Sequence, residues 1–286
     1  MQNYYLLGSP IRHSLSPAMM NLSFSELGID AEYGLMETDI DLLPSAVQKL
    51  KENGASGWNL TMPVKSAMCS LCDELSPSAL IGQVVNTVVN RHGKLFGYTT
   101  DGAGFRRAAC DAGFSVPCRK MVLLGTGGAA SSILIESALS GSGEISVFCN
   151  RPSSRTKIEA VAKRLSDYSK TKIKTFFYSE PHALENEIRE SSLLVNATNI
   201  GMAGRPEDSG TDCLIPDIRC LSAQPDVFDA IYNPRKTPLL NLAEKAGCRT
   251  ANGLMMLLFQ GAEAFRLWTG EEMPTPLVRK KIFPDS

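Results

Sequence analysis

The stretch MVLLGTGGAASSILIESAL, residues 121–139, joins an apolar strand to a helix through a turn rich in glycine. A second apolar run, ISVFC, follows at 145–149. Strand, helix and strand in this order form one unit of a parallel sheet. The pattern predicts the α/β fold class.

Short apolar strands alternate with helical patterns on both sides of this stretch. The expected strands are 4–8, 31–37, 57–60, 192–197 and 226–231. The first helices are expected to open at Ser-Pro (16–17) and Thr-Met-Pro (61–63), since proline suits a first helical turn. Near the end, residues 252–268 predict a helix whose core-facing positions share helical spacing: Leu254, Leu257, Leu258, Gly261, Phe265 and Trp268.

The length of the chain predicts two domains. Its 286 residues exceed what one core usually organises, and 43% apolar residues can fill two. A glycine-bearing segment enters a helix near 101–104, which marks a boundary. We expect one domain at 1–101, joined by the terminal helices of 252–286, and another at 102–251.

Charge and cysteine content exclude several classes of protein. With 29 basic and 30 acidic residues, no basic field exists to bind nucleic acid or an anionic membrane. No apolar run is long enough for a membrane helix, and the N-terminus has no secretion signal. Eight dispersed cysteines indicate free thiols in the cytoplasm, and Cys69 with Cys72 supplies only half a structural zinc site.

The glycine turn is a candidate dinucleotide site: Gly125, Thr126, Gly127, Gly128 and Ala129. A tight turn there would let backbone amides and the helix dipole meet a pyrophosphate. A ligand-free turn between strand and helix is the alternative.

The end of the next strand favours NADP over NAD. It reads Cys149-Asn150-Arg151, with Arg155 following, where an NAD enzyme would carry an acidic residue. Two guanidinium groups can pair with a 2′-phosphate and stack on adenine. A solvated basic loop is the alternative.

Polar residues near the first strands are candidate substrate ligands. Ser14 and Ser16 bring two hydroxyls to a helix start, where a carboxylate would bind, although Ser16 could be only an N-cap. Thr61 and Lys65 lie one helical turn apart around Pro63. Asn86 and Asp101 follow, and a lysine or aspartate in such places is usually a solvated charge or a cap.

Nine segments together resemble the shikimate dehydrogenase family over nearly the whole chain. They are GSPIRHSLSP, GWNLTMPVK, VVNT, TTDGAGF, LLGTGGAA, Asn150-Arg151, VNATNIGM, VFDAIYNPRKTPLL and NGLMMLLFQGAEAFRLWTG. The resemblance implies an N-terminal α/β substrate domain, an NADP-binding Rossmann domain and an active site in the cleft between them. It implies reversible NADPH-dependent reduction of 3-dehydroshikimate to shikimate, a step of chorismate and aromatic amino-acid biosynthesis.

The resemblance also implies a role for each matching residue. Lys65 and Asp101 would be the catalytic pair, and Ser14 and Ser16 would hold the substrate carboxylate. Thr61, Asn86, Asp101 and Gln260 would contact ring hydroxyls, with Tyr232 near the substrate. The segments that line the nicotinamide side contain Asn196, Thr198, Met202 and Gly253.

The proposed chemistry agrees with these roles. Hydride addition to a ketone builds negative charge on oxygen, and a lysine ammonium can stabilise that charge and donate the proton. Asp101 would orient the substrate hydroxyl and favour the charged lysine. No metal is required, and we interpret His13 as structural.

The match departs from the family pattern at five positions: Met20, Gln83, Val84, Thr99 and Pro152. Thr99 stands two residues before Asp101 and could alter how a substrate hydroxyl is received. A quinate or quinate/shikimate dehydrogenase is therefore an alternative, as is an NADP-binding regulator without catalysis. We expect a monomer or a homodimer.

Overall fold

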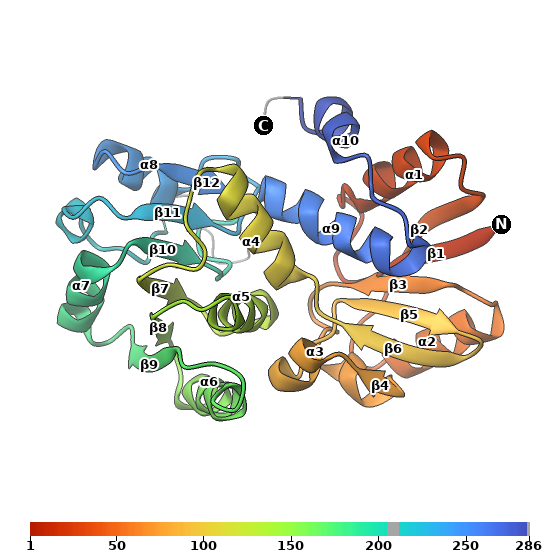
Figure 1. Cartoon of the computed structure of the whole chain (residues 1–286), viewed down its shortest axis with the longest axis horizontal. Helices are drawn as coiled ribbons and strands as arrows, with labels where there is room; N and C mark the ends of the chain where they lie inside the picture. Colours follow the sequence, from red (N-terminus) through yellow and green to blue (C-terminus); the bar gives the residue numbers. More distant parts are fainter. Residues whose placement is uncertain (205–211, 285–286) are drawn as a thin grey trace. The chain divides into compact units, whose positions relative to one another are not determined.

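The structure is a computed structural model that describes residues 1–204 and 212–284. The chain forms two compact units, Met1–Gly104 with Leu257–Ser286, and Phe105–Met256. Both boundaries fall inside helices, α4 (Asp101–Asp111) and α9 (Leu254–Thr269) (Figure 1). The sequence places its boundaries a few residues earlier, and 205–211 and 285–286 of the expected domains lie outside the described residues.

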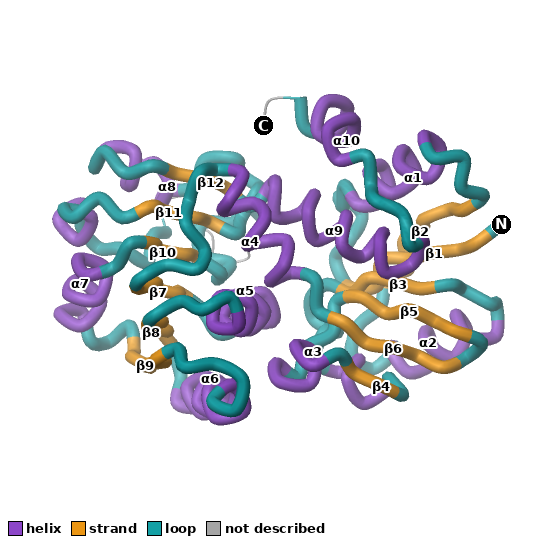
Figure 2. The backbone as a smooth tube through the Cα atoms, in the orientation of Figure 1, coloured by secondary structure: helices purple, strands orange, loops and turns teal. Residues whose placement is uncertain are grey.

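The first unit is built on a six-stranded sheet in the order β2-β1-β3-β5-β6-β4 (Figure 2). Its strands are β1 (Gln2–Gly8), β2 (Ala31–Glu37), β3 (Gly57–Leu60), β4 (Glu74–Leu75), β5 (Thr87–Arg91) and β6 (Lys94–Tyr98). Its helices are α1 (Ser16–Glu26), α2 (Leu43–Glu52), α3 (Pro77–Gly82), α10 (Thr275–Ile282) and most of α9, with the 3₁₀ helix η1 (Ala67–Leu71).

This sheet is mixed, whereas the sequence pattern predicted parallel strands. β5 pairs antiparallel with both β3 and β6. Only His92 and Gly93 separate β5 from β6, and both have positive φ, 54° and 85°. A two-residue turn of this kind joins neighbouring strands of a hairpin, which requires no crossover helix.

The segment after Thr61 also differs from the prediction of a helix at Pro63. Residues 62–66 form turns, and the 3₁₀ helix η1 begins only at Ala67. Cys69 lies in η1, and Cys72 is its extended C-cap. A residue before proline is pushed away from helical backbone angles, which explains why no helix starts at Met62.

Two apolar clusters cover the two faces of the first sheet. One contains Trp58, Leu60, Val64 and Val88 with residues of α2 and η1. The other is aromatic: the ring of Tyr4 stacks on Trp268 of α9 at 4.7 Å and on Phe24 of α1 at 5.3 Å. These clusters confirm that the terminal helix has an apolar core-facing side, and they hold α1 and α9 against the sheet.

The second unit has a fully parallel sheet in the order β12-β11-β10-β7-β8-β9. Its strands are β7 (Lys120–Leu124), β8 (Glu144–Cys149), β9 (Lys172–Phe177), β10 (Leu193–Asn196), β11 (Asp226–Asp229) and β12 (Thr250–Asn252). Its other elements are α5 (Gly128–Leu139), α6 (Pro152–Leu165), α7 (Pro181–Glu190), α8 (Pro238–Lys245) and η2 (Ile218–Leu221). The order reverses between β7 and β10, which is the switch point of a doubly wound sheet.

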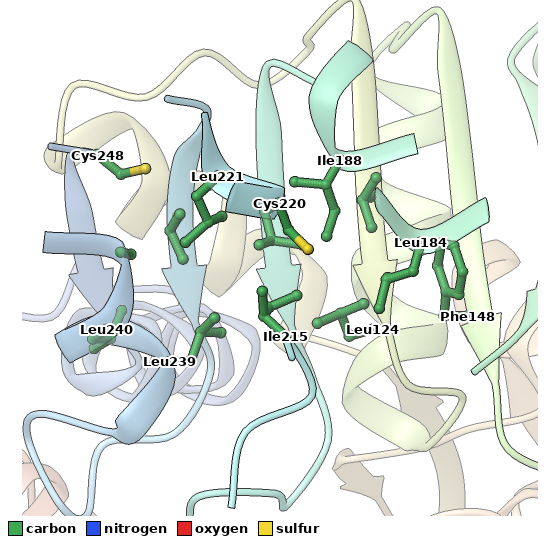
Figure 3. Close-up of a cluster of buried hydrophobic side chains, with 14 residues drawn as sticks. Leu124, Phe148, Leu184, Ile188, Ile215, Cys220, Leu221, Leu239, Leu240 and Cys248 are labelled. Carbon is green, nitrogen blue, oxygen red and sulfur yellow. The ribbon is translucent and has the colours of Figure 1, made fainter. Parts of the chain in front are cut away.

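Side chains of alternate strand residues pack helices on both faces of this sheet. Leu124 and Val227 contact a cluster from α7, η2 and α8 (Figure 3). Phe228 points to the opposite face, where its ring meets Phe105 of α4 edge-on at 5.0 Å. The α/β fold class is confirmed. Among the described residues, no helix has the length and apolar character needed to cross a membrane.

Candidate functional site

Three predicted substrate ligands lie at one edge of the first sheet. Thr61 follows the end of β3, Asp101 follows β6 after two residues, and Asn86 directly precedes β5. Because β5 runs opposite to its two neighbours, its first residue meets their last ones. The topology therefore gathers residues that are up to 40 positions apart in sequence (101 minus 61).

Lys65 and Asp101 form a close ion pair. The Lys65 Nζ lies 2.5 Å from Asp101 Oδ2, and the two side chains are only 16% and 8% exposed. Asp101 is the first residue of α4, where a carboxylate complements the helix dipole. Partial burial strengthens such a pair compared with one in open solvent, and one ammonium is thus held at a defined position.

Asn86 connects this pair to Gln260 in α9. Its side-chain amide donates to Asp101 Oδ1 at 2.9 Å and to Gln260 Oε1 at 3.3 Å. Its side-chain oxygen accepts from the Thr100 amide at 2.7 Å. Each oxygen of Asp101 thus has its own donor. The structure brings four predicted residues together: Lys65, Asp101, Asn86 and Gln260.

Gly104 allows Gln260 to approach. A Cβ at Gly104 would lie 2.6 Å from the Gln260 amide nitrogen and 2.7 Å from its Cβ. Any side chain at this position would push α9 away from α4. The glycine of the TTDGAGF segment thus has a packing role that places Gln260 beside Asn86.

Ser14 and Ser16 lie where β1 leads into α1. The N-cap of α1 is Leu15, and no side chain caps this helix end, so the alternative that Ser16 is an N-cap is wrong. Instead the Ser16 amide donates to Ser14 Oγ at 3.2 Å, and Ser16 itself is 5% exposed. The Ser14 hydroxyl thus accepts the first amide of α1, whereas the Ser16 hydroxyl caps no amide of this helix. His13 beside them is exposed.

Two candidates remain, Thr61 in the first unit and Tyr232 in the second. Within the described part of the chain, no hydrogen bond joins Thr61 to Lys65, Asp101 or Asn86. Tyr232 belongs to the second unit, where it follows β11, and burial raises the pKa of its hydroxyl.

The glycine turn of the second unit lies at the switch point of its sheet. Gly125 follows β7 with φ +111°, and a Cβ there would meet Ala197 O and Thr198 Cγ2 at 2.9 Å. Gly127 is the N-cap of α5, and a Cβ on it would have no atom within 4 Å. An open approach to a helix N-terminus of 12 residues suits an anionic group.

The strand that follows ends without a carboxylate. Asn150 and Arg151 are exposed, and within residues 1–204 and 212–284 the Arg151 carbonyl accepts from the Arg155 amide while its guanidinium has no hydrogen bond or ion pair. Arg155 Nε lies 2.9 Å from Glu159 Oε1, and its guanidinium stacks over Phe177 at 5.2 Å. One arginine is thus available to an anion, and the other must share its charge with Glu159.

Asp229 ties the end of β10, where three predicted nicotinamide-side residues begin, to the segment that follows β11. Its Oδ1 accepts from the Asn196 amide and the Ile231 backbone, both at 3.0 Å, and its Oδ2 accepts from Thr237 at 2.7 Å. Asn196 in turn holds the Thr198 hydroxyl at 2.8 Å. Met202 lies on the same loop.

Gly253 directly follows β12 and packs against Ala230, which follows β11. A Cβ there would lie 2.0 Å from Ala230 O, so only glycine fits beside the β11 loop.

The pKa of Asp229 makes the stability of the second unit depend on pH. Burial raises that pKa from 3.8 to about 6, and the hydrogen bonds from Thr237, Ile231 and Asn196 offset only part of the effect. Because the folded protein holds this proton more tightly than the unfolded chain, the contribution is most favourable below about pH 4. It is lost as the pH rises through 6.

We expect Asp229→Asn to remove this dependence. The free energy of unfolding of the wild type, relative to the variant, should fall by about 2 kcal/mol between pH 4 and pH 7. Denaturant unfolding at a series of pH values measures this difference. A difference that stays constant with pH would show that Asp229 keeps an ordinary pKa.

Some residues of the first unit were not recognised in the sequence. Asn59 and Thr87 are buried polar residues whose hydrogen bonds reach Asn86, and Tyr33 donates to Asn59. An asparagine in the four-residue buried strand GWNL was a usable signal, because a buried amide needs partners. In the second unit, Asp229 within the apolar strand DVFD gave the same kind of signal.

Four of the five positions that depart from the family pattern fit the structure as ordinary core or helix-end residues. Met20 and Val84 are buried core residues, and Pro152 is the first residue of α6, where proline is favoured. Gln83 is the left-handed C-cap of α3. No cluster of three metal-ligating side chains occurs in the described ranges.

Two family models match the chain. The shikimate dehydrogenase substrate binding domain matches residues 6–88, and the shikimate 5′-dehydrogenase C-terminal domain matches residues 253–283. These ranges contain most of the first-unit cluster, from Ser14 to Asn86 and Gln260.

Curated and solved relatives cover nearly the whole chain. A protein of Listeria monocytogenes named shikimate dehydrogenase (NADP(+)) is 40% identical over 97% of this chain and 94% of its own. A Listeria monocytogenes shikimate 5-dehydrogenase in complex with shikimate and NAD has a TM-score of 0.91 at 38% identity, covering 99% of this chain and 96% of that one. Quinate dehydrogenase of Corynebacterium glutamicum with NAD has a TM-score of 0.85 at 26% identity, covering 99% of both chains.

The family models, the sequence identity to curated relatives and the similarity to solved structures all indicate the same family. The family inferred from the motifs is confirmed. The chain belongs to the shikimate dehydrogenase family.

Proposed function

We propose that the protein catalyses the reversible NADPH-dependent reduction of 3-dehydroshikimate to shikimate. The observation that carries this proposal is the Lys65–Asp101 ion pair, which Asn86 links to Gln260. Its curated relative at 40% identity is named for this activity and cofactor. The reaction is an oxidation–reduction step of aromatic amino-acid biosynthesis through chorismate.

The Lys65 ammonium performs the acid–base part of this reaction. When a hydride adds to the ketone carbon, the carbonyl oxygen gains negative charge, and the ammonium stabilises that charge and donates its proton to the oxygen. In the reverse direction the amine takes the hydroxyl proton. Asp101 keeps the ammonium at 2.5 Å and orients the substrate hydroxyl.

Amide side chains position the substrate ring. Asn86 and Gln260 each combine a donor with an acceptor, so they can bind hydroxyls on either side of the reacting one. Because Asn86 already bonds both Asp101 and Gln260, its orientation is set before substrate arrives. Preorganisation of this kind lowers the cost of reaching the reactive geometry.

The residues of the second unit suit the binding of NADP. The cofactor supplies or accepts the hydride when bound. The open approach at Gly127 and the N-terminus of α5 suit its pyrophosphate, and the unpaired guanidinium of Arg151 suits its 2′-phosphate. Arg155 stacks on Phe177 and can turn its charge from Glu159 to the same phosphate.

The serines at α1 provide the carboxylate site in this proposal, and their loss should weaken substrate binding. We expect Ser14→Ala with Ser16→Ala to raise the KM for shikimate by about tenfold, since each lost hydroxyl donor is worth about 0.5–1.5 kcal/mol. Steady-state kinetics measure the change. An analogue with a neutral amide in place of the carboxylate is the control, and its penalty should be smaller.

The effect of the two substitutions on stability is measured separately from their effect on binding. Ser16 caps nothing in α1, but Ser14 Oγ accepts the Ser16 amide at 3.2 Å, so the double variant should have a slightly lower melting temperature. Equal penalties for acid and amide would remove the serines from the carboxylate site, whatever the change in melting temperature.

A matrix of two substrates and two cofactors tests the proposed function directly. Shikimate and quinate are each assayed with NADP and NAD at the absorbance band of the reduced nicotinamide. We expect the highest kcat/KM for shikimate with NADP. Quinate is the second candidate, because a quinate dehydrogenase shares this fold at a TM-score of 0.85. No turnover in any of the four assays would favour a non-catalytic regulator.

We also propose that the protein acts in the cytoplasm as a monomer or a homodimer. Its eight cysteines are all free thiols, which suits a reducing compartment. The mass measured by sedimentation decides the oligomeric state.

A further inference from the structure

One buried carboxylate is bonded to both ends of the segment that joins β11 to α8, residues 230–237. Asp229 is the last residue of β11 and is 0% exposed. Its Oδ1 accepts from the Ile231 amide at 3.0 Å, near the start of the segment, and its Oδ2 accepts from the Thr237 hydroxyl at 2.7 Å, at the end. Thr237 is also the N-cap of α8, where its hydroxyl oxygen accepts the Leu240 amide at 3.3 Å. The path of segment 230–237 is therefore fixed at both ends by one side chain.

The same carboxylate holds the segment that follows β10, residues 197–204, through Asn196. The side-chain oxygen of Asn196 accepts from the amide and the hydroxyl of Thr198, at 3.0 and 2.8 Å. Because a backbone amide can only donate, the side-chain amide of Asn196 has one orientation. Its nitrogen donates to Asp229 Oδ1 at 3.0 Å and to Ile200 O at 3.3 Å. Segment 197–204 thus begins from a residue that Asp229 holds in place.

Backbone hydrogen bonds also join the two segments to each other and to the end of β12. The Ala203 amide donates to Asn233 O at 3.0 Å. The Gly253 amide donates to Ile231 O, also at 3.0 Å. Segment 230–237 therefore lies between the residues that follow β10 and those that follow β12, and a shift of this segment would affect both.

Asp229 suits this position because it accepts several bonds and donates none. Burial raises its pKa to about 6, so the carboxylate is ionised at neutral pH. Three donors reach it, from Asn196, Ile231 and Thr237. Breaking any of these bonds would leave a buried polar atom without a partner, so the three donors stay in one arrangement.

We propose that Asp229 is a positioning residue for the nicotinamide half of NADP. It keeps segment 197–204, with Thr198 and Met202, in a fixed place relative to segment 230–237, with Tyr232. This inference rests on the proposed function, with the roles beside nicotinamide and substrate that the family resemblance gives these residues. A ligand binds more tightly to segments that are already in place than to segments that must first be ordered.

Asp229→Asn tests this role through the binding of two ligands. Asparagine has an NH2 group in place of one oxygen, and this group cannot accept a bond from Thr237, Asn196 or Ile231. At least one of the three bonds is therefore lost. We expect the Kd of NADP to rise about tenfold, while the Kd of adenosine 2′,5′-bisphosphate changes less than about twofold. Isothermal titration calorimetry at neutral pH measures both values.

The second ligand separates positioning from general damage to the second unit. Adenosine 2′,5′-bisphosphate has the adenine and the 2′-phosphate of NADP but lacks the nicotinamide. A variant that merely unfolds or distorts the second unit would lose both ligands, whereas displaced segments on the nicotinamide side would affect NADP alone.

Asp226→Asn is the matched control, because Asp226 is the first residue of the same strand. Its carboxylate accepts from Arg249 Nε at 2.8 Å and from Arg249 Nη2 at 2.6 Å. The substitution weakens this ion pair at the opposite end of β11 from Asp229. We expect the wild-type Kd for both ligands. A loss of NADP affinity equal to that in Asp229→Asn would show that any damage to β11 has this effect, and it would overturn the inference.

Thr237 provides a second pair of variants, which decides the question if Asp229→Asn does not fold. Thr237→Val keeps the shape of the side chain but removes the donor to Asp229 Oδ2 and the cap of α8, whereas Thr237→Ser keeps the hydroxyl. We expect the Kd of NADP to rise about fivefold in Thr237→Val and less than about twofold in Thr237→Ser, with the bisphosphate bound as in the wild type by both. Equal losses in the two variants would assign the effect to packing and overturn the role of the bond.

The outcomes distinguish this inference from the proposed function. If the wild type binds NADP and Asp229→Asn weakens both ligands equally, or weakens neither, the positioning role alone is overturned. A wild-type protein that does not bind NADP would overturn the proposed function and this inference with it.

Discussion

Replacing Lys65 with alanine lowers kcat by about a hundredfold or more while the KM for shikimate stays nearly constant. The ammonium acts on charge that forms in the transition state, so its loss affects the barrier more than the binding of the ground state. Steady-state kinetics with NADP at saturation give both constants. A variant with wild-type kcat and a raised KM would make Lys65 a binding residue and end this mechanism.

Lys94→Ala is the matched control for this experiment. Lys94 also lies in the first unit, and its Nζ is 2.5 Å from Glu74 Oε1, the same separation as in the Lys65–Asp101 pair. The side chains of Lys94 and Glu74 are both about half exposed, and exposed pairs contribute little to stability. We therefore expect wild-type kcat in Lys94→Ala, which shows that losing a lysine ion pair in this unit does not itself slow the reaction.

Replacing both Arg151 and Arg155 with alanine raises the KM for NADP by about a hundredfold and leaves that for NAD nearly unchanged. The two cofactors differ by one phosphate. A hundredfold change corresponds to a loss of nearly 3 kcal/mol of binding free energy, which is what charge-assisted hydrogen bonds to that phosphate can contribute. Kinetics with each cofactor at saturating shikimate measure the two values. If both cofactors lost affinity equally, the arginines would have a role at a part that the cofactors share.

Arg189→Ala with Arg219→Ala is the control for lost positive charge. Both arginines lie on the surface of the second unit, and they pair with Glu185 and Asp217. Removing them changes the net charge by the same amount as the first pair of substitutions. We expect no change in cofactor preference, because neither residue belongs to the end of β8 or the start of α6.

The sequence was most informative about the buried strands of the second unit. Strands β7, β8, β10 and β11 were predicted within two residues of their ends, because runs buried on both faces are continuously apolar. β9 was missed, since KIKTFF is an edge strand with only partly buried side chains. The hairpin of the first unit was also missed, because its His-Gly turn is a weak signal compared with Asn-Gly.

The motifs named residues at the candidate sites but could not show how they are connected. The spacing of Lys65 and Asp101 in sequence says nothing about their contact, which depends on the meeting of β3, β5 and β6. Ser16 before Pro17 resembled an N-cap, yet the helix takes Leu15 in that place. Tyr33 gave no signal, since a tyrosine in a strand is ordinary and its hydrogen bond to Asn59 forms only in the folded sheet.

The discontinuity of the first unit has a consequence for protein synthesis. Residues 105–256 leave the ribosome as one uninterrupted stretch, whereas Met1–Gly104 must wait for Leu257 and the residues after it. Domains generally fold as units once their chain is complete. The second unit is therefore the first to be complete, although it comes second in the chain. A nascent chain arrested before α9 would have the glycine turn and both arginines but would lack Gln260 as the partner of Asn86. With the site residues as proposed, affinity for the cofactor would thus arise during translation before catalytic activity does.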